Sequence, residues 1–251
     1  MTETRTSFIA GHGGAPLAVH RVGAGRPVLL LHGLFSSGEV NWIKYGHAQQ
    51  LADAGFEAIA PDLRAHGQSD ASHDPAVYAV DVLVRDALAL VAALGLEDYD
   101  LAGFSLGART AVRAVLAGLA PRRLVLGGMG IEGLGNWAAR SAFFVNAIDH
   151  YDDIKRDDPD YFVQQFLKTM KIDRVAARLL LGSVDDTSPD SLAGIAIPTL
   201  VVCGAEDQDN GSAPALAEAL PNGRYLEIPG THMSSVTQKE LGKAIVDFLT
   251  A

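Results

Sequence analysis

The amino-acid sequence predicts an α/β fold with a mostly parallel central sheet flanked by helices. Short apolar runs bounded by Gly, Pro or Asp recur along the chain, and helical periodicities separate most of them. Strands that alternate with helices need crossover connections, which favour a parallel sheet covered on both faces. A chain of 251 residues can form such a fold as one domain.

The expected strands begin near residue 17 and end near residue 228. The first two are separated by Gly23-Ala24-Gly25, which we interpret as the turn of a hairpin. The full set is Leu17–Val22, Val28–His32, Phe56–Pro61, Tyr99–Phe104, Arg123–Gly127, Ile197–Cys203 and Arg224–Ile228.

Helices are expected between these strands and after the last one. Each is indicated by apolar residues three or four positions apart, which form one face of a helix. The expected helical segments contain Leu83, Ala87, Leu90 and Leu94, then Ala111 to Leu119, and finally Leu241, Ile245, Phe248 and Leu249.

Residues 131–190 interrupt the alternation. This stretch is rich in aromatic and acidic residues and has no strand-like run, while Phe162, Phe166 and Met170 have helical spacing. About 60 residues rarely support an independent core. We therefore expect a helical cap inserted into a single domain, whose core consists of residues 1–130 and 191–251.

Composition excludes several function classes. The net charge is −10 and no run of Lys or Arg occurs, so nucleic acid and anionic membranes are unexpected partners. The single cysteine, Cys203, excludes an intramolecular disulfide and a Cys-rich zinc site. The N-terminal residues lead into no long apolar stretch, and Pro27–Phe35 is far shorter than the ~20 residues that cross a bilayer. A cytoplasmic location is the expectation.

A possible nucleophile lies in Gly103-Phe104-Ser105-Leu106-Gly107. This stretch follows an expected strand and precedes an expected helix. A serine on so sharp a turn needs small residues two positions before and after it, because larger side chains would collide. The pattern indicates an exposed, nucleophilic Ser105.

A general base and an orienting acid are expected on two later loops. His232 follows the strand Arg224–Ile228, and Asp207 follows the strand Ile197–Cys203. Active sites of parallel α/β sheets collect at the carboxyl ends of the strands, where these loops can meet Ser105. The order Ser105, Asp207, His232 thus predicts a nucleophile, an acid and a base. Asp209 and Glu206 are weaker candidates for the acid.

Taken together, four landmarks resemble the α/β-hydrolase superfamily over essentially the whole chain. They are His32-Gly33-Leu34-Phe35, the loop from Pro61 to Ser69, the elbow around Ser105, and the loops of Asp207 and His232. In the second landmark, Ala65 stands where the family pattern has glycine, which puts the backbone shape of that loop in question. The resemblance implies the α/β-hydrolase fold, in a serine-nucleophile, esterase-like branch with a short cap.

The resemblance also implies roles for the site residues. Ser105 attacks a carbonyl carbon, His232 moves the proton, and Asp207 orients the imidazole. The backbone N–H groups of Leu34 and Leu106 form the oxyanion hole, with Phe35 as the next candidate. No cofactor or metal is implied. Branches that open epoxides or displace halide use aspartate at the elbow, so Ser105 disfavours those reactions.

The expected function is hydrolysis of a small carboxylic ester, thioester or lactone. Alternatives on the same site are an enol-lactone hydrolase, a carbon–carbon bond hydrolase or a cofactor-free perhydrolase. A small-molecule receptor on the same fold is the non-enzyme alternative. The oligomeric state stays open.

The expected pocket is aromatic, which favours a substrate with an apolar moiety. Its candidate lining residues are Phe35, Trp42, Trp137, Phe143 and Phe144, and no cluster of Arg or Lys marks an anion site.

Three weaker patterns have structural interpretations. Gly128–Gly133 matches G-x-G-x-x-G but is interpreted as the connection to the cap, and His32 and His66 as loop-stabilising residues. The acidic residues between Asp149 and Asp160 lack the spacing of a calcium loop, so no metal site is expected there.

Overall fold

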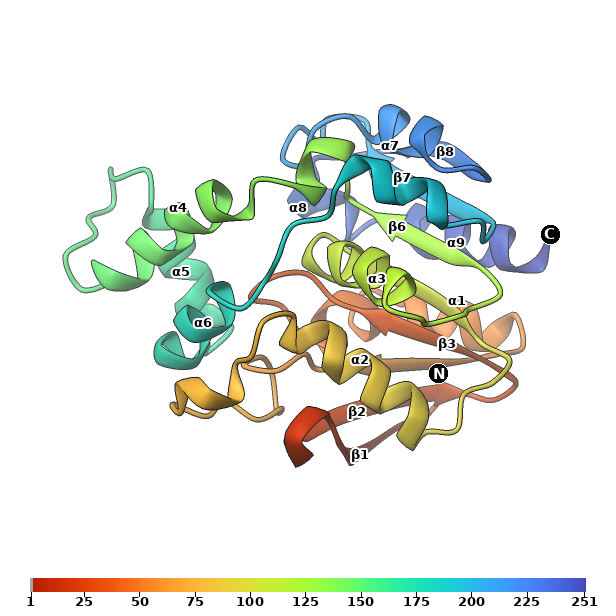
Figure 1. Ribbon diagram of the computed structural model, residues 1–251, viewed down its shortest axis with the longest axis horizontal. Helices are drawn as coiled ribbons and strands as arrows, with labels where there is room; N and C mark the ends of the chain where they lie inside the picture. The colour runs from red at the N-terminus through yellow and green to blue at the C-terminus, as the bar shows by residue number, and fades with distance from the viewer. Residues whose placement is uncertain (1) are drawn as a thin grey trace.

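The computed structural model describes residues 2–251 and contains a single eight-stranded sheet with helices on both faces (Figure 1). The strand order is β1-β2-β4-β3-β5-β6-β7-β8. The pairs β1–β2 and β2–β4 are antiparallel, and all later pairs are parallel. The predicted α/β class with a mostly parallel sheet is confirmed.

Each predicted strand has its counterpart, with ends shifted by at most a few residues. The one additional strand, β1, is exposed along almost its whole length and therefore has no apolar run that could reveal it. The strands are β1 Thr4–Ala10, β2 Pro16–Gly23, β3 Arg26–Leu31, β4 Phe56–Pro61, β5 Asp100–Phe104, β6 Leu124–Gly127, β7 Thr199–Gly204 and β8 Gly223–Ile228.

The predicted hairpin at Gly23–Gly25 is wrong. Strand β4 lies between β2 and β3, pairing antiparallel with one and parallel with the other. Gly23 and Gly25 have φ values of 85° and 119°, and a side chain on either would collide with the backbone at Gly55 or Phe56. These glycines let the chain pass closely beside the start of β4, rather than turn back on itself.

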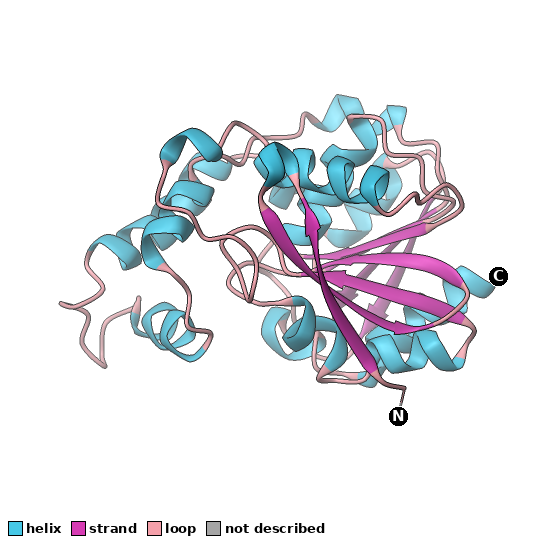
Figure 2. Ribbon diagram, turned by 90° about the horizontal axis from the view of Figure 1, so that it is seen from below, coloured by secondary structure: helices cyan, strands magenta, loops and turns pink. Residues whose placement is uncertain are grey.

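Helices cover both faces of the sheet (Figure 2). Side chains alternate along the strands, so Leu29 and Leu31 of β3 pack with one buried cluster and Val28 and Leu30 with the other. The first cluster includes residues of α2 Val82–Ala93, α3 Leu106–Leu116 and α7 Ala213–Ala219; the second includes residues of α1 His47–Asp53 and α9 Lys239–Thr250.

The segment between β6 and β7 forms helices α4 Trp137–Asp149, α5 Tyr161–Thr169 and α6 Arg174–Leu181. These helices lie beyond one end of the sheet, at the left of Figure 1. We call residues 131–190 the cap. The last short helix, α8 His232–Ser235, begins at the candidate base. None of the helices within residues 2–251 combines the length and apolar composition needed to cross a membrane.

Candidate active site

Ser105 occupies a sharp turn between β5 and α3. Its backbone has φ 53° and ψ −115°, a conformation rarely adopted by residues with a side chain. A Cβ on Gly103 would collide with the backbone of Gly107 and Ala108, and one on Gly107 would collide with Leu31. The two glycines therefore allow the turn that brings the Ser105 hydroxyl to the carboxyl end of the sheet.

Three loops bring Ser105, His232 and Asp207 into one chain of hydrogen bonds. His232 Nδ1 lies 2.9 Å from Asp207 Oδ2, and His232 Nε2 lies 3.0 Å from Ser105 Oγ. An ionised carboxylate can only accept, so Nδ1–H donates to Asp207 and Nε2 accepts from the Ser105 hydroxyl. The imidazole is thereby held in the tautomer that a base acting on Ser105 requires.

The surroundings of Asp207 favour its ionised form. Burial acts to raise its pKa, but the hydrogen bond and charge of His232 and the N–H of Asp209 together hold the pKa below its usual value. Cys203 Sγ lies 3.4 Å from Asp207 Oδ2, and burial together with this carboxylate raises the pKa of the Cys203 thiol to about 12. Cys203 therefore stays protonated and can donate to Asp207.

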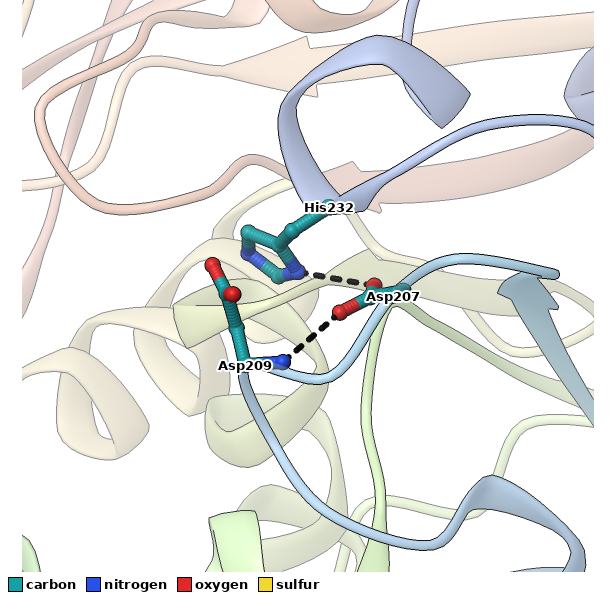
Figure 3. A group of neighbouring side chains, drawn as sticks. All are labelled: Asp207, Asp209 and His232. Atoms are coloured by element: carbon teal, nitrogen blue, oxygen red, sulfur yellow. Dashed lines mark hydrogen bonds and ion pairs between the residues drawn. The ribbon is translucent and has the colours of Figure 1, made fainter.

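The two weaker acid candidates lie differently. Asp209 donates its backbone N–H to Asp207, and its carboxylate lies beside the His232 ring (Figure 3). Glu206 is exposed. Of the three candidate acids, Asp207 is the one that is hydrogen-bonded to His232.

Asp207, Asp209 and His232 also have potential metal-ligand atoms within 4.8 Å of one another (Figure 3). However, Asp207 and His232 are hydrogen-bonded to each other, and the second ring nitrogen of His232 binds Ser105. A cation would have to break this chain. The arrangement fits proton transfer better than metal binding.

The predicted oxyanion donors lie beside Ser105. Leu34, Leu106 and Ser105 line the same small chamber. Leu106 is the first residue of α3, and within residues 2–251 neither its N–H nor that of Leu34 has an acceptor. The N–H of Phe35, the alternative donor, instead donates to His66 Nε2 at 2.9 Å.

His32 and His66 connect the loop that follows β3 to the loop that follows β4. His32 Nε2 accepts from the N–H of Leu63, as His66 Nε2 does from Phe35. Complete burial lowers the pKa of His32 to about 4 and that of His66 to about 3, so both are neutral at pH 7. Ala65, in the second loop, has φ 63° and thus keeps the left-handed conformation that would favour glycine.

A cavity of about 580 Å³ opens at Ser105 and His232. Of the five predicted lining residues, Phe35 and Phe144 line it, joined by Phe162 and Phe166 of α5, which were predicted only as helix residues. The remaining lining residues are Gly33, Leu34, Ser36, Val40, Asn41, Tyr45, Phe104, Gln165, Thr169, Met233, Val236 and Thr237.

Two of the predicted lining residues lie elsewhere. Trp42 is 1% exposed and packs with His47 in the core cluster on the α1 side of the sheet, because a π-helical turn over Glu39–Ile43 directs it inward. Phe143 is not among the lining residues; it is partly exposed and stacks on Phe162.

A second, smaller chamber of about 40 Å³ adjoins the cavity, since Leu34, Ser105 and Phe144 line both. Trp137, the fifth predicted lining residue, is found here. Arg109 and Arg140 also line this chamber, together with Leu34, Ser105, Leu106, Met129, Gly133, Phe144 and Asn210. The sequence showed no cluster of basic residues because these arginines belong to different helices, α3 and α4.

The two remaining motifs have structural partners. In the Gly128–Gly133 stretch, Gly133 donates its N–H to the backbone of Asn210 and accepts from Arg109, so this connection packs against the core. In the acidic part of the cap, Asp149 pairs with Arg178 at 2.6 Å.

Comparisons with known proteins show which proteins this chain is similar to. The family model described as "alpha/beta hydrolase fold" matches residues 26–124. The chain is 34% identical over 130 residues to N-formylmaleamate deformylase of Pseudomonas putida, covering 50% of this chain and 46% of that protein. It is 37% identical over 103 residues to an epoxide hydrolase of Caballeronia sordidicola, covering 41% of this chain and 30% of that protein. These matches therefore span less than half the length of either relative.

The solved structures agree on the fold. An esterase from Exiguobacterium antarcticum has a TM-score of 0.77 with 21% identity, over 98% of this chain and 100% of the other. This likeness covers the cap as well as the sheet. With the family match over residues 26–124, it shows that the chain has the α/β-hydrolase fold.

Proposed function

We propose that this protein is a serine hydrolase that cleaves small carboxylic esters, thioesters or lactones. The observation that carries the proposal is the chain of hydrogen bonds from Ser105 through His232 to Asp207, at 3.0 and 2.9 Å. The serine at the start of this chain lines a largely apolar cavity. A nucleophile, its base and an orienting acid are the groups that acyl transfer requires.

In the first half of the reaction, Ser105 Oγ attacks the carbonyl carbon while its proton moves to His232 Nε2. The negative oxygen of the tetrahedral intermediate accepts from the N–H groups of Leu34 and Leu106. Such donors typically contribute about 3–4 kcal/mol each to transition-state stabilisation. The carbon–heteroatom bond then breaks, and the leaving group takes the proton from His232, which leaves an ester on Ser105.

In the second half, water replaces the leaving group. His232 takes a proton from the water, whose oxygen attacks the acyl carbon of the Ser105 ester. The bond to Oγ breaks and the proton returns to Ser105, which releases a carboxylic acid. Asp207, held ionised by its surroundings, stabilises the imidazolium in both halves.

The nature of the nucleophile argues against epoxide opening, although relatives with that name were found. A carboxylate that opens an epoxide forms an ester, which water can hydrolyse. A serine would instead form an ether, which this site could not cleave. Ser105 therefore favours substrates with a carbonyl group.

Labelling with a fluorophosphonate tests the proposal. Its phosphorus bonds to an activated serine oxygen and fluoride leaves. We expect intact-mass spectrometry to show one adduct on the unaltered protein and none on Ser105→Ala. Ser188→Ala, which alters an exposed serine, is the matched control and should label fully. A folded protein without an adduct, or an adduct that persists in Ser105→Ala, would contradict the proposal.

A further inference from the structure

We infer that the small chamber beside Ser105 binds a carboxylate carried by the acyl part of the substrate, with Arg140 as its cationic partner. This inference rests on the proposed function and deepens it by naming a substrate class: half-esters of short dicarboxylic acids. It would explain why two arginines line a chamber next to the nucleophile in a protein of net charge −10.

The two arginines differ in what already binds them. Arg109 is buried, donates to Asp186 Oδ1 and to the backbone oxygen of Gly133, and lies over the Trp137 ring. Arg140 is half-buried and donates to the neutral side chain of Asn210. Within residues 2–251, no carboxylate lies within ion-pair distance of Arg140. Arg109 thus has an ion-pair partner, whereas Arg140 has none among the described residues.

Acidic side chains are absent from the walls of the chamber, among the residues described. The nearby carboxylates have other partners: Asp186 accepts from Arg109 and from the N–H of Trp137, and Glu132 accepts from the N–H of Ser212. Asp209 lies beside His232 and lines neither the chamber nor the cavity. An anion in the chamber would therefore meet a net positive charge in a confined space, where charge interactions are strong.

The position of His232 indicates which part of the substrate enters which space. The leaving group must lie near His232, because it takes the proton from Nε2. His232 lines the large cavity and not the small chamber. With the carbonyl oxygen directed at Leu34 and Leu106, the acyl substituent lies in the small chamber, on the side away from His232, where Arg140 also lines the wall. The apolar moiety thus belongs to the leaving group.

The size of the chamber limits the acyl group. A volume of about 40 Å³ accommodates only a few water-sized groups. A carboxylate one or two carbons from the scissile carbonyl fits this space, as in malonyl or succinyl half-esters. A longer chain would need more space than the chamber provides.

The test compares benzyl hemisuccinate with benzyl succinamate, its neutral isostere, by following release of benzyl alcohol. We expect kcat/KM to be at least tenfold higher for the hemisuccinate. Arg140→Gln should reduce this ratio at least tenfold. Arg156→Gln removes the same charge from an exposed position on the cap and should leave the ratio unchanged. Benzyl hemiadipate should lose most of the preference.

The outcomes separate the inference from the proposed function. If Ser105 labels with fluorophosphonate but the succinamate is cleaved as well as the hemisuccinate, only the carboxylate pocket is refuted. If Arg140→Gln lowers both rates equally, Arg140 serves only to fasten the cap through Asn210, and the inference is again wrong. Failure of labelling would instead remove the proposed function on which the inference depends.

Discussion

At the scale of single residues, Ser105 combines an uncommon backbone conformation with an ordered side chain. Conformations such as φ 53°, ψ −115° typically cost about 1–3 kcal/mol and persist only where surrounding contacts impose them. Here those contacts are the close approaches at Gly103 and Gly107. In this conformation Ser105 Oγ lies 3.0 Å from His232 Nε2.

The acid assignment can be tested by two matched substitutions. In Asp207→Asn, the amide would donate to His232 Nδ1 and force the proton onto Nε2, which could then no longer accept from Ser105. We expect kcat to fall by about 10⁴. Asp209→Asn should change kcat by less than about fivefold, since its side chain makes no hydrogen bond to His232. The measurement is the kcat of each variant for the same ester. The midpoint of urea unfolding shows whether each variant is still folded. A large loss in Asp209→Asn alone would reverse the assignment.

The sequence could predict that Ser105, Asp207 and His232 lie together, because each follows a strand and the carboxyl ends of parallel strands meet at one edge. It could not place Trp42, Phe143 or Arg140. Their surroundings depend on how a π-helical turn and the cap helices pack, and local residue patterns carry no signal for either.

At the scale of elements, a buried ion pair joins the loop after β4 to helix α2. Arg64 Nε and Nη2 donate to the two oxygens of Asp86 at 2.9 and 2.7 Å, and both residues are almost completely buried. Asp86 also accepts from the N–H of His12 at 2.8 Å. This pair fixes the loop whose His66 in turn accepts from the N–H of Phe35.

Removing one partner of the Arg64–Asp86 pair should therefore lower the free energy of unfolding. We expect Arg64→Met to lower the free energy of unfolding by about 3–5 kcal/mol, because the Asp86 carboxylate would stay buried without its cation. Urea denaturation measures the change. The double variant Arg64→Met/Asp86→Leu should lose less than the sum of the single variants. Additive losses would mean that the two side chains do not interact.

The strands and helices of the core could be predicted because their apolar runs and periodicities reflect burial on one or both faces. Strand β1 could not, since its side chains are almost all exposed. The order of β2, β4 and β3 was also missed. The glycines at 23 and 25 are compatible both with a hairpin and with a close passage beside β4, and only the tertiary fold distinguishes the two.

At the scale of the whole molecule, the buried histidines connect stability to pH. His32 and His66 have pKa values of about 4 and about 3 when folded, below the ordinary value of 6.5, because burial disfavours their charged forms. The unfolded chain thus binds more protons below pH 6.5. Their stabilising contribution is complete above that pH and decreases as pH falls toward 4.

These two histidines should lower the free energy of unfolding between pH 6 and 4.5, with a combined slope approaching about 2.7 kcal/mol per pH unit, or about 1.4 per histidine. The buried His47, whose pKa burial also lowers, adds to this slope. Urea midpoints across this range measure it. His66→Gln should reduce the slope by about 1.4 kcal/mol per pH unit, whatever it does to stability at pH 7. An unchanged slope in this variant would show that His66 does not titrate as expected.

The cap leaves the core after β6 and returns at β7, and these strands are direct neighbours, paired from Leu124 and Thr199 onward. Both ends of the insertion are therefore anchored at one place in the sheet, and its length has no influence on strand register. Ser105, Asp207 and His232 all lie outside it. Under the proposed function, substrate preference and bond-breaking chemistry can thus change independently. The cap could be replaced by the corresponding segment of a similar protein while Ser105, Asp207 and His232 stay in place.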